Sequence, residues 1–174
     1  EGIRMINLTK QEVKTIYAGS RSPKMQTFTF SADGDTLLIT DDNGRGTKGD
    51  ITMPNIHYLL RSEGFQKLRT YSYSSCTYGL VYMPDGTIFF ATYPNASIMK
   101  LVRNSGVPII DGSATVCFDF LRSAGRQVKM RAHPSGKFVY IFSRYEGGIY
   151  KSEYDPVAKM LNSPTLVAGS TLAG

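Results

Sequence analysis

The sequence predicts an all-β chain built from a repeated four-stranded unit, and three observations support this. Eleven Tyr and nine Phe among 174 residues, with many Ile, Val and Thr, favour short strands over long helices. Seventeen Gly and eight Pro supply frequent turns. A strand–turn–strand segment also recurs three times, with turns that end in Gly34, Gly86 and Gly136 at spacings of 52 and 50 residues.

Each recurring segment consists of two apolar strands joined by a tight turn. The three segments are 26–40, 78–92 and 128–143. Their turns contain Asp-Gly or Ser-Gly, and these residue types tolerate the positive φ that a tight hairpin requires between right-twisted strands. Pro84 and Pro134 come just before two of the turns, where no N–H is needed for strand pairing. The local sequence therefore predicts three β-hairpins.

Two further strand-like stretches follow each hairpin. They are 56–61 and 65–71, then 97–102 and 107–110, and finally 148–154 and 164–168. The chain opens with residues 3–8 and 13–19, which look like the third and fourth strands of a preceding unit. Four strands in roughly 50 residues is the size of a β-propeller blade.

We therefore predict a partial β-propeller with three four-stranded antiparallel blades plus half-blades at the ends. The segment 1–174 divides into the end of a preceding blade and three blades: 1–19, 20–71, 72–122 and 123–169. Because propellers usually carry about 4 to 8 blades, we expect this segment to belong to a larger ring, closed by remaining blades or by a partner. A β-sandwich also has many short strands, but it does not explain the in-phase glycine turns.

Charge and hydropathy exclude two classes of partner. The net charge of +6 comes from scattered Lys and Arg residues without a basic stripe or a reading motif, so we expect no nucleic-acid partner. No window reaches the roughly 18 to 20 apolar residues of a membrane helix, so we expect no transmembrane segment. Cys76 and Cys117 are compatible with one disulfide or with two buried thiols, and buried thiols are the commoner arrangement.

Three stretches of the sequence resemble known propeller repeats. Residues 3–9 and 13–19 resemble the closing stretch of an NHL repeat, and residues 83–91 resemble its hairpin. Residues 133–140 resemble the hairpin of YVTN-type and lactonase-like propellers. The repeat style is similar to the TIG-plus-NHL surface lipoproteins of gut Bacteroidetes, although this chain has no TIG domain. That resemblance implies an extracytoplasmic location, at the cell surface or secreted, and a role in binding glycans or other nutrients.

The connections between second and third strands are the candidate binding loops. In a propeller they surround the mouth of the central channel, where ligands usually bind. The longest runs from Asp41 to Pro54 and exceeds the roughly 2 to 5 residues of a hairpin loop. Tyr rings suit the apolar face of a sugar, and Asp, Asn and Arg suit its hydroxyls. We therefore predict a carbohydrate or protein ligand bound by Asp42, Asn43, Arg45, Tyr93, Asn95, Arg144 and Tyr145.

We predict a binding protein with no catalytic residues, and keep a metal-dependent propeller enzyme of lactonase or lyase type as the alternative. The chain has no nucleophile elbow, no HExxH and no phosphate-binding glycine loop. Such an enzyme would draw acidic and Asn ligands from channel-facing positions of several blades. The first-strand openings, Gln26, Tyr78 and Val128, offer no carboxylate.

We expect no cofactor and no metal, with calcium as the weaker possibility. Oxygen-bearing residues that could ligate Ca²⁺ gather in the longest loop at Asp41, Asp42, Asn43 and Asp50, but their spacing does not match a calcium-loop motif. The two His residues are too few for a zinc site. We expect His133 to hydrogen-bond within its own hairpin.

Overall fold

The computed structural model describes residues 2–18, 25–41, 55–72, 79–92, 97–101, 115–119, 128–143 and 147–169. Four antiparallel sheets follow one another along these residues. The first sheet contains β1 (Gly2–Asn7) and β2 (Glu12–Ala18). The second contains β3 (Met25–Phe30), β4 (Thr36–Asp41), β5 (Asn55–Leu60) and β6 (Arg69–Ser72), in that order.

The other two sheets repeat this arrangement. The third sheet contains β7 (Gly79–Tyr82), β8 (Ile88–Ala91), β9 (Ser97–Leu101) and β10 (Thr115–Asp119). The fourth contains β11 (Val128–Ala132), β12 (Phe138–Ser143), β13 (Gly148–Asp155) and β15 (Thr165–Gly169), with the short β14 (Met160–Leu161) also paired to β13.

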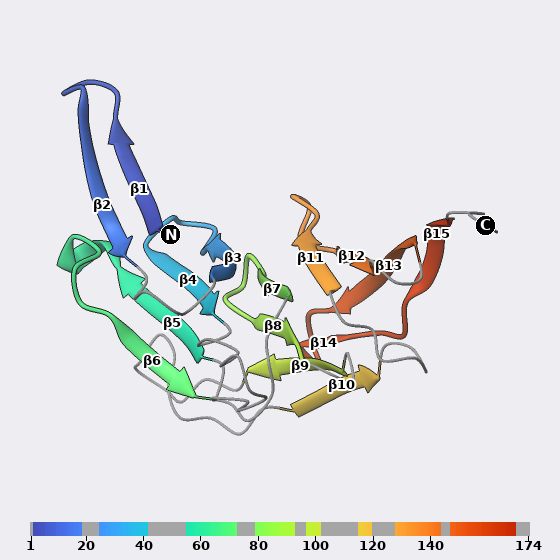
Figure 1. The fold of residues 1–174 in the computed structure, drawn as a ribbon. Coiled ribbons are helices and arrows are strands. Elements are labelled where there is room, and N and C mark those ends of the chain that lie inside the picture. Colours follow the sequence, from blue (N-terminus) through green and yellow to red (C-terminus); the bar gives the residue numbers. More distant parts are fainter. Residues whose placement is uncertain are drawn as a thin grey trace, which may run out of the picture.

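The sheets are arranged along a curve. Figure 1 shows β3, β7 and β11 on the inner side of this curve, with β6, β10 and β15 farther out. Antiparallel pairing of consecutive strands, repeated in sheet after sheet, is the architecture of propeller blades. The prediction of an all-β partial propeller is confirmed.

The glycine turns form as predicted. Gly34, Gly86 and Gly136 have φ of 73°, 88° and 69°, a conformation that glycine adopts without steric cost. In each turn the glycine N–H donates to the carbonyl three residues earlier, at 2.9 Å. These local bonds fix the connection between the first and second strands of each sheet.

Two outer strands differ from their predicted positions. The predicted strand 107–110 lies outside the described residues, and the structure places the outer strand β10 at Thr115–Asp119, paired with β9. The predicted strand 65–71 begins only at Arg69, because Arg61–Glu63 forms a 3₁₀ turn. Gly64, with φ of 62°, ends that turn by donating its N–H to the Arg61 carbonyl at 2.8 Å.

The hydrophobic core lies between neighbouring sheets, in three layers. The layer between the first and second sheets includes Ile3, Ile16, Leu37, Ile39 and Leu59. The layer between the second and third includes Leu38, Ile56, Leu80, Ile88 and Phe90. The layer between the third and fourth includes Val81, Met83, Phe89, Val128, Met130, Val139 and Ile141. The second and third sheets therefore contribute side chains to two layers each.

Candidate functional site

All seven predicted ligand-binding residues lie outside the described residues: Asp42, Asn43, Arg45, Tyr93, Asn95, Arg144 and Tyr145. Of the residues considered for calcium, only Asp41 is within a described strand, as the last residue of β4. What the structure describes is the set of strand ends that flank these segments.

The flanking strand ends lie at equivalent places in three sheets. Asp41 pairs with Asn55, Ala91 pairs with Ile98, and Ser143 pairs with Gly148, so each second strand ends beside the start of its third strand. The glycine turns lie at the opposite ends of the same second strands. The segments that carry the predicted binding residues therefore leave and rejoin the sheets at one common edge, which we call the loop-bearing edge.

In the third sheet, three hydrogen bonds hold the end of the second strand beside the start of the third strand. The Thr92 N–H donates to the Ser97 carbonyl at 3.0 Å, and the Ser97 N–H donates to Thr92 Oγ1 at 3.1 Å. The Thr92 hydroxyl also reaches the Ser97 carbonyl at 3.4 Å. Because Thr92 is itself buried, the two ends of the segment that carries Tyr93 and Asn95 are held together on a rigid base.

Hydroxyl side chains lie at or next to the end of the second strand in each of the three sheets. Thr40 precedes the last residue of β4, Thr92 follows the last residue of β8, and Ser143 is the last residue of β12; all three are buried. Among the described residues, the hydroxyl oxygens of Thr40 and Ser143 find no hydrogen-bond partner, although these two side chains are only 0% and 1% exposed. An unsatisfied buried hydroxyl costs about 1–3 kcal/mol. The loop-bearing edge thus contains unused hydrogen-bonding capacity.

At the opposite edge, polar groups connect the third and fourth sheets. The Tyr154 hydroxyl donates to Asp85 Oδ2 at 2.5 Å and contacts Thr87 Oγ1 at 2.9 Å. Burial and the adjacent Asp85 carboxylate raise the pKa of Tyr154 to about 12. Burial alone would raise the pKa of Asp85, but its hydrogen bonds from Tyr154 and Thr87 outweigh this and lower that pKa. The group is a structural link between blades.

His133 behaves as predicted. Its ring Nδ1 lies 2.8 Å from Ser135 Oγ and accepts the Ser135 N–H at 3.2 Å, so it bonds within its own hairpin. The ring also stacks on Phe138, with centroids 4.3 Å apart. His57, the other histidine, is buried and packs near the Tyr17 ring at a centroid distance of 5.9 Å.

The described part of the chain shows no metal site. No three of its His, Cys, Asp or Glu side chains come together in a way that could hold a metal ion. Cys117 is a free thiol whose pKa is raised by burial, with its sulfur 3.9 Å from Met160 Sδ. Cys76 lies outside the described residues, but because Cys117 is a free thiol the structure has no disulfide between the two. Within the described residues, no helix is long and apolar enough to span a membrane.

Comparisons with known proteins support the fold. No family model matches the sequence, and no curated protein matches it. Among solved structures, an auxiliary nutrient binding protein from Bacteroides thetaiotaomicron VPI-5482 is similar at a TM-score of 0.79 and 24% identity, over 97% of this chain and 37% of that one. A similarly named protein from Bacteroides ovatus ATCC 8483 has a TM-score of 0.71 and 19% identity, over 98% and 37% of the two chains.

An enzyme shares the same architecture. A catalytically inactive variant of virginiamycin B lyase from Staphylococcus aureus is similar at a TM-score of 0.66 and 14% identity, over 99% of this chain and 50% of that one. The chain spans 37% of each of the two nutrient binding proteins. At these identities the likenesses show a propeller fold, and membership of the NHL group stays a prediction.

Two basic residues escaped the sequence analysis. Lys129 and Arg131 lie on β11, the innermost strand of the fourth sheet, and point away from the buried Val128 and Met130. Val128, at the start of the first strand of its sheet, was predicted to face the central channel. It is instead 1% exposed, in the core layer between the third and fourth sheets. Burial lowers the pKa of Lys129, and the neighbouring Arg131 charge lowers it further. The alternation of apolar and basic residues from 128 to 131 is the sequence pattern that indicates that Lys129 and Arg131 share one face of the strand.

Proposed function

We propose that this chain is part of a non-catalytic binding propeller that takes a carbohydrate or protein ligand at its loop-bearing edge. The observation that carries the proposal is the common edge itself, since paired strand ends of three sheets flank all seven predicted binding residues. A rigid sheet scaffold that presents several variable loops on one side is a common way to build a binding site.

Three further features support this function. Within the described residues, the buried hydroxyls of Thr40 and Ser143 near this edge have no hydrogen-bond partner, and an ordered water can satisfy such groups. Two of the most similar solved structures are named auxiliary nutrient binding proteins. That naming, together with the resemblance to surface lipoproteins, supports an extracytoplasmic location and, within the binding class, a carbohydrate as the first ligand to test.

Glycan-array binding of the purified chain tests the proposal. We expect binding to one or a few glycans, and we expect Tyr93→Ala and Tyr145→Ala each to weaken it at least roughly tenfold, as for the loss of a central aromatic contact. Tyr140→Ala is the matched control, because Tyr140 is 38% exposed but lies on β12 and not in a loop. Glycan binding that is equally sensitive to all three changes, or insensitive to Tyr93 and Tyr145, would refute the choice of loops.

A metal measurement separates this function from the propeller enzyme. We expect the chain, purified without chelators, to contain no stoichiometric Ca²⁺ or Zn²⁺. One equivalent of either metal, together with metal-dependent turnover of a lactone or a cyclic ester, would replace the binding function with catalysis.

A further inference from the structure

At the loop-bearing edge of the third sheet, Thr92 and Ser97 form a pair that differs from an ordinary strand pair. In a regular hydrogen-bonded antiparallel pair, each residue donates its N–H to the carbonyl of the other. Here the Thr92 N–H donates to the Ser97 carbonyl at 3.0 Å, but the Ser97 N–H donates to the Thr92 hydroxyl at 3.1 Å. The same hydroxyl donates to the Ser97 carbonyl at 3.4 Å. A side-chain oxygen therefore takes the place of a backbone carbonyl, one residue beyond the end of β8.

This pair continues a buried part of the sheet. The next pair along the two strands is Ala91 with Ile98, and both residues are 0% exposed. Residues 93–96 connect Thr92 to Ser97 and include two of the predicted binding residues, Tyr93 and Asn95. Because both ends of this four-residue connection are bonded to each other, fewer backbone conformations are accessible between them.

The corresponding junction of the fourth sheet is built differently. Ser143 ends β12 and pairs with Gly148, the first residue of β13. Its side chain also carries a hydroxyl, yet that hydroxyl finds no hydrogen-bond partner among the described residues. The bond from a side-chain oxygen to the facing N–H is therefore specific to the Thr92 junction, and it does not follow merely from a hydroxyl residue near the end of a second strand.

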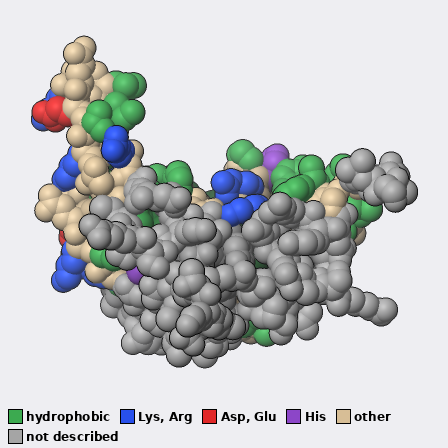
Figure 2. All heavy atoms as spheres, in the orientation of Figure 1, with side chains coloured by type: hydrophobic (Ala, Val, Ile, Leu, Met, Phe, Trp, Pro, Cys, Tyr) green, Lys and Arg blue, Asp and Glu red, His purple; other side chains and the backbone are tan. Residues whose placement is uncertain are grey.

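Hydrogen bonds between uncharged groups hold this junction. Residues 91–99 include no charged side chain, although the whole chain has a net charge of +6. Figure 2 shows Lys and Arg side chains on the first sheet, and others beside hydrophobic side chains on the inner side of the curve. Because salt screens charges and not neutral hydrogen bonds, the Thr92 junction should be insensitive to ionic strength.

We propose that Thr92 is a positioning residue of the binding site: its hydroxyl holds the segment 93–96 closed, so that Tyr93 meets the ligand in one orientation. This role rests on the proposed function, because Tyr93 is one of its predicted binding residues. A side chain that is already held in place loses less conformational entropy when a ligand binds. Thr92 therefore raises the affinity for the ligand without touching it.

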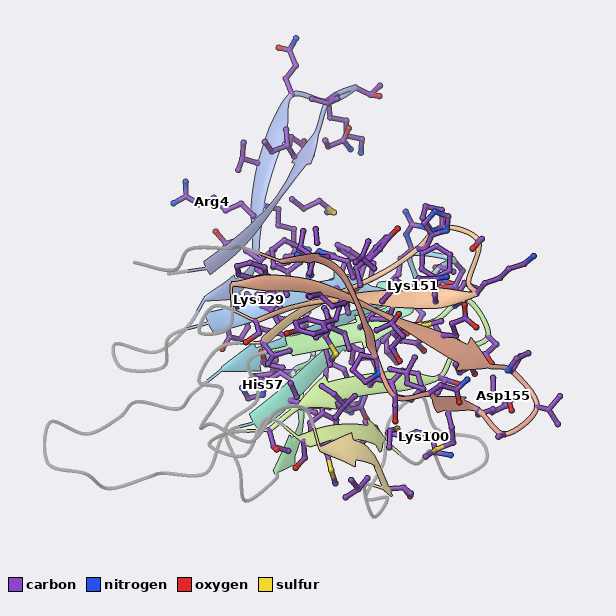
Figure 3. The ribbon with its side chains drawn as sticks, turned by 90° about the vertical axis from the view of Figure 1, so that its right-hand side faces the viewer. Arg4, His57, Lys100, Lys129, Lys151 and Asp155 are labelled. Carbon is purple, nitrogen blue, oxygen red and sulfur yellow. The ribbon has the colours of Figure 1, made fainter. Side chains whose placement is uncertain are left out.

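Thr87 is the matched control residue. It directly precedes β8 as Thr92 directly follows it, and both threonines are 7% exposed. The Thr87 hydroxyl lies 2.9 Å from the Tyr154 hydroxyl, at the edge opposite the loops. In Figure 3 the strands run between these two edges, with Lys129 near the loop-bearing edge and Asp155 near the opposite one. Valine in place of either threonine removes a buried hydroxyl and its hydrogen bonding with little change of shape.

A single tryptophan tests the role of Thr92 without any ligand. The sequence contains no Trp, so the fluorescence of a Tyr93→Trp variant reports on position 93 alone. Acrylamide is the quencher, because it is neutral and the chain is basic. We expect added Thr92→Val to increase the quenching constant and to lower the fluorescence anisotropy. Added Thr92→Ser should restore both values, and added Thr87→Val should leave both unchanged.

The second measurement uses the glycan that gives the strongest array signal with the parent chain, and here Tyr93 is retained. Thr92→Val should weaken binding of this glycan about three- to tenfold, which corresponds to one hydrogen bond. Thr92→Ser should restore the affinity. Thr87→Val should keep the affinity of the parent chain, although both valine variants lower the temperature of thermal unfolding.

Three results would overturn the role of Thr92. They are unchanged quenching in Thr92→Val, unchanged affinity despite increased quenching, and an equal loss of affinity in Thr87→Val, which would reflect general destabilisation. A parent chain that binds no glycan would instead refute the proposed function. The quenching comparison would still decide whether Thr92 orders position 93, because it requires no glycan.

Discussion

The two faces of the fourth sheet are built from the same strands but have different surroundings. Along β12, Val139 and Ile141 are 0% exposed against the third sheet, whereas Tyr140 and Phe142, the residues between and after them, are 38% and 44% exposed. Alternation along a strand decides to which side a residue points. Whether that side is buried depends on the neighbouring sheet, which the strand's own sequence does not encode.

The face of the fourth sheet that packs on the third sheet, which we call the closed face, also has polar contacts at its edge. Tyr154 of β13 reaches Asp85 and Thr87 in the turn of the third sheet, and the Phe89 ring packs edge-on against Tyr154 at a centroid distance of 5.8 Å. On the opposite face of the fourth sheet, which carries Tyr140 and Phe142 and which we call the open face, Lys151 forms an ion pair with Glu153 of the same strand. We therefore expect stability to depend on closed-face residues and to tolerate changes on the open face.

The strongest test compares two phenylalanines. Phe89→Ala removes a ring that is 0% exposed between the third and fourth sheets and should lower the free energy of unfolding by about 3–5 kcal/mol. Phe142→Ala, on the open face, should cost about 1 kcal/mol or less, since much of that ring already contacts solvent. Urea denaturation followed by circular dichroism measures both. Equal losses would show that the open face is covered in solution.

Gly79 tests the contact between β7 and β11, the innermost strands of the third and fourth sheets. A Cβ there would lie 2.8 Å from the Val128 carbonyl oxygen and 3.3 Å from Ala91 Cβ, so the backbones of β7 and β11 would have to separate. Gly79→Ala should cost about 1–3 kcal/mol. It should also increase the oxidation rate of Met130, which is now 1% exposed.

The control for that change is a glycine without close neighbours. A Cβ on Gly34 would meet nothing within 4 Å, and its φ is 73°. Gly34→Ala should cost about 1–2 kcal/mol from backbone strain alone. It should leave Met130 protected. An unchanged Met130 in Gly79→Ala would mean that the two strands are not in contact there.

The parts of the fold that the sequence predicted are local. The Asp-Gly and Ser-Gly turns carry their own signal, and Gly34, Gly86 and Gly136 have the expected positive φ. The sequence did not predict β10, because strand propensity pointed to the apolar residues 107–110, which lie outside the described residues, whereas β10 pairs with β9 through Thr115 and Lys100. That pairing is a long-range contact that strand propensity does not report.

The candidate site was predictable to a smaller extent. Loop length and residue type led to Asp42, Tyr93, Arg144 and their companions, which lie outside the described residues and stay predictions. Lys129 and Arg131 were missed although they alternate with buried Val128 and Met130. A period of two shows that they share one face, but the same pattern fits a solvated strand as well as a docking surface.

The hydrogen bond between Tyr154 and Asp85, at the edge of the closed face, gives a pH-dependent prediction. Tyr154→Phe removes the hydrogen bond to Asp85 and should cost about 1–2 kcal/mol at pH 7. Tyr140→Phe, on the open face, should be almost neutral. Because the pKa of Asp85 is lowered in the folded state, its contribution is present above the unfolded value of about 4 and is lost as the pH falls through the folded value.

At high pH the same pair behaves in the opposite sense. The pKa of Tyr154 is raised to about 12, so its contribution is complete below the unfolded value of about 10 and is lost as the pH rises toward 12. Chemical denaturation at pH 3, 7 and 11 should therefore show the largest difference between the parent chain and Tyr154→Phe at pH 7. A difference that is the same at all three values would mean that the hydroxyl makes no bond to Asp85.

The smallest effect is expected on the open face, at Lys151. Its ammonium pairs with Glu153 at 3.0 Å and lies 4.7 Å from the centre of the Phe138 ring. Because the Glu153 side chain is 68% exposed, the ion pair contributes little, and Lys151→Met should cost about 0.5–1 kcal/mol, mainly through the cation–π contact. Lys151→Arg should be neutral. If 1 M NaCl abolished the loss, the ion pair would be the main contributor, because salt screens exposed charges. A loss above about 2 kcal/mol would exceed both contacts together and would mean that Lys151 has a buried role.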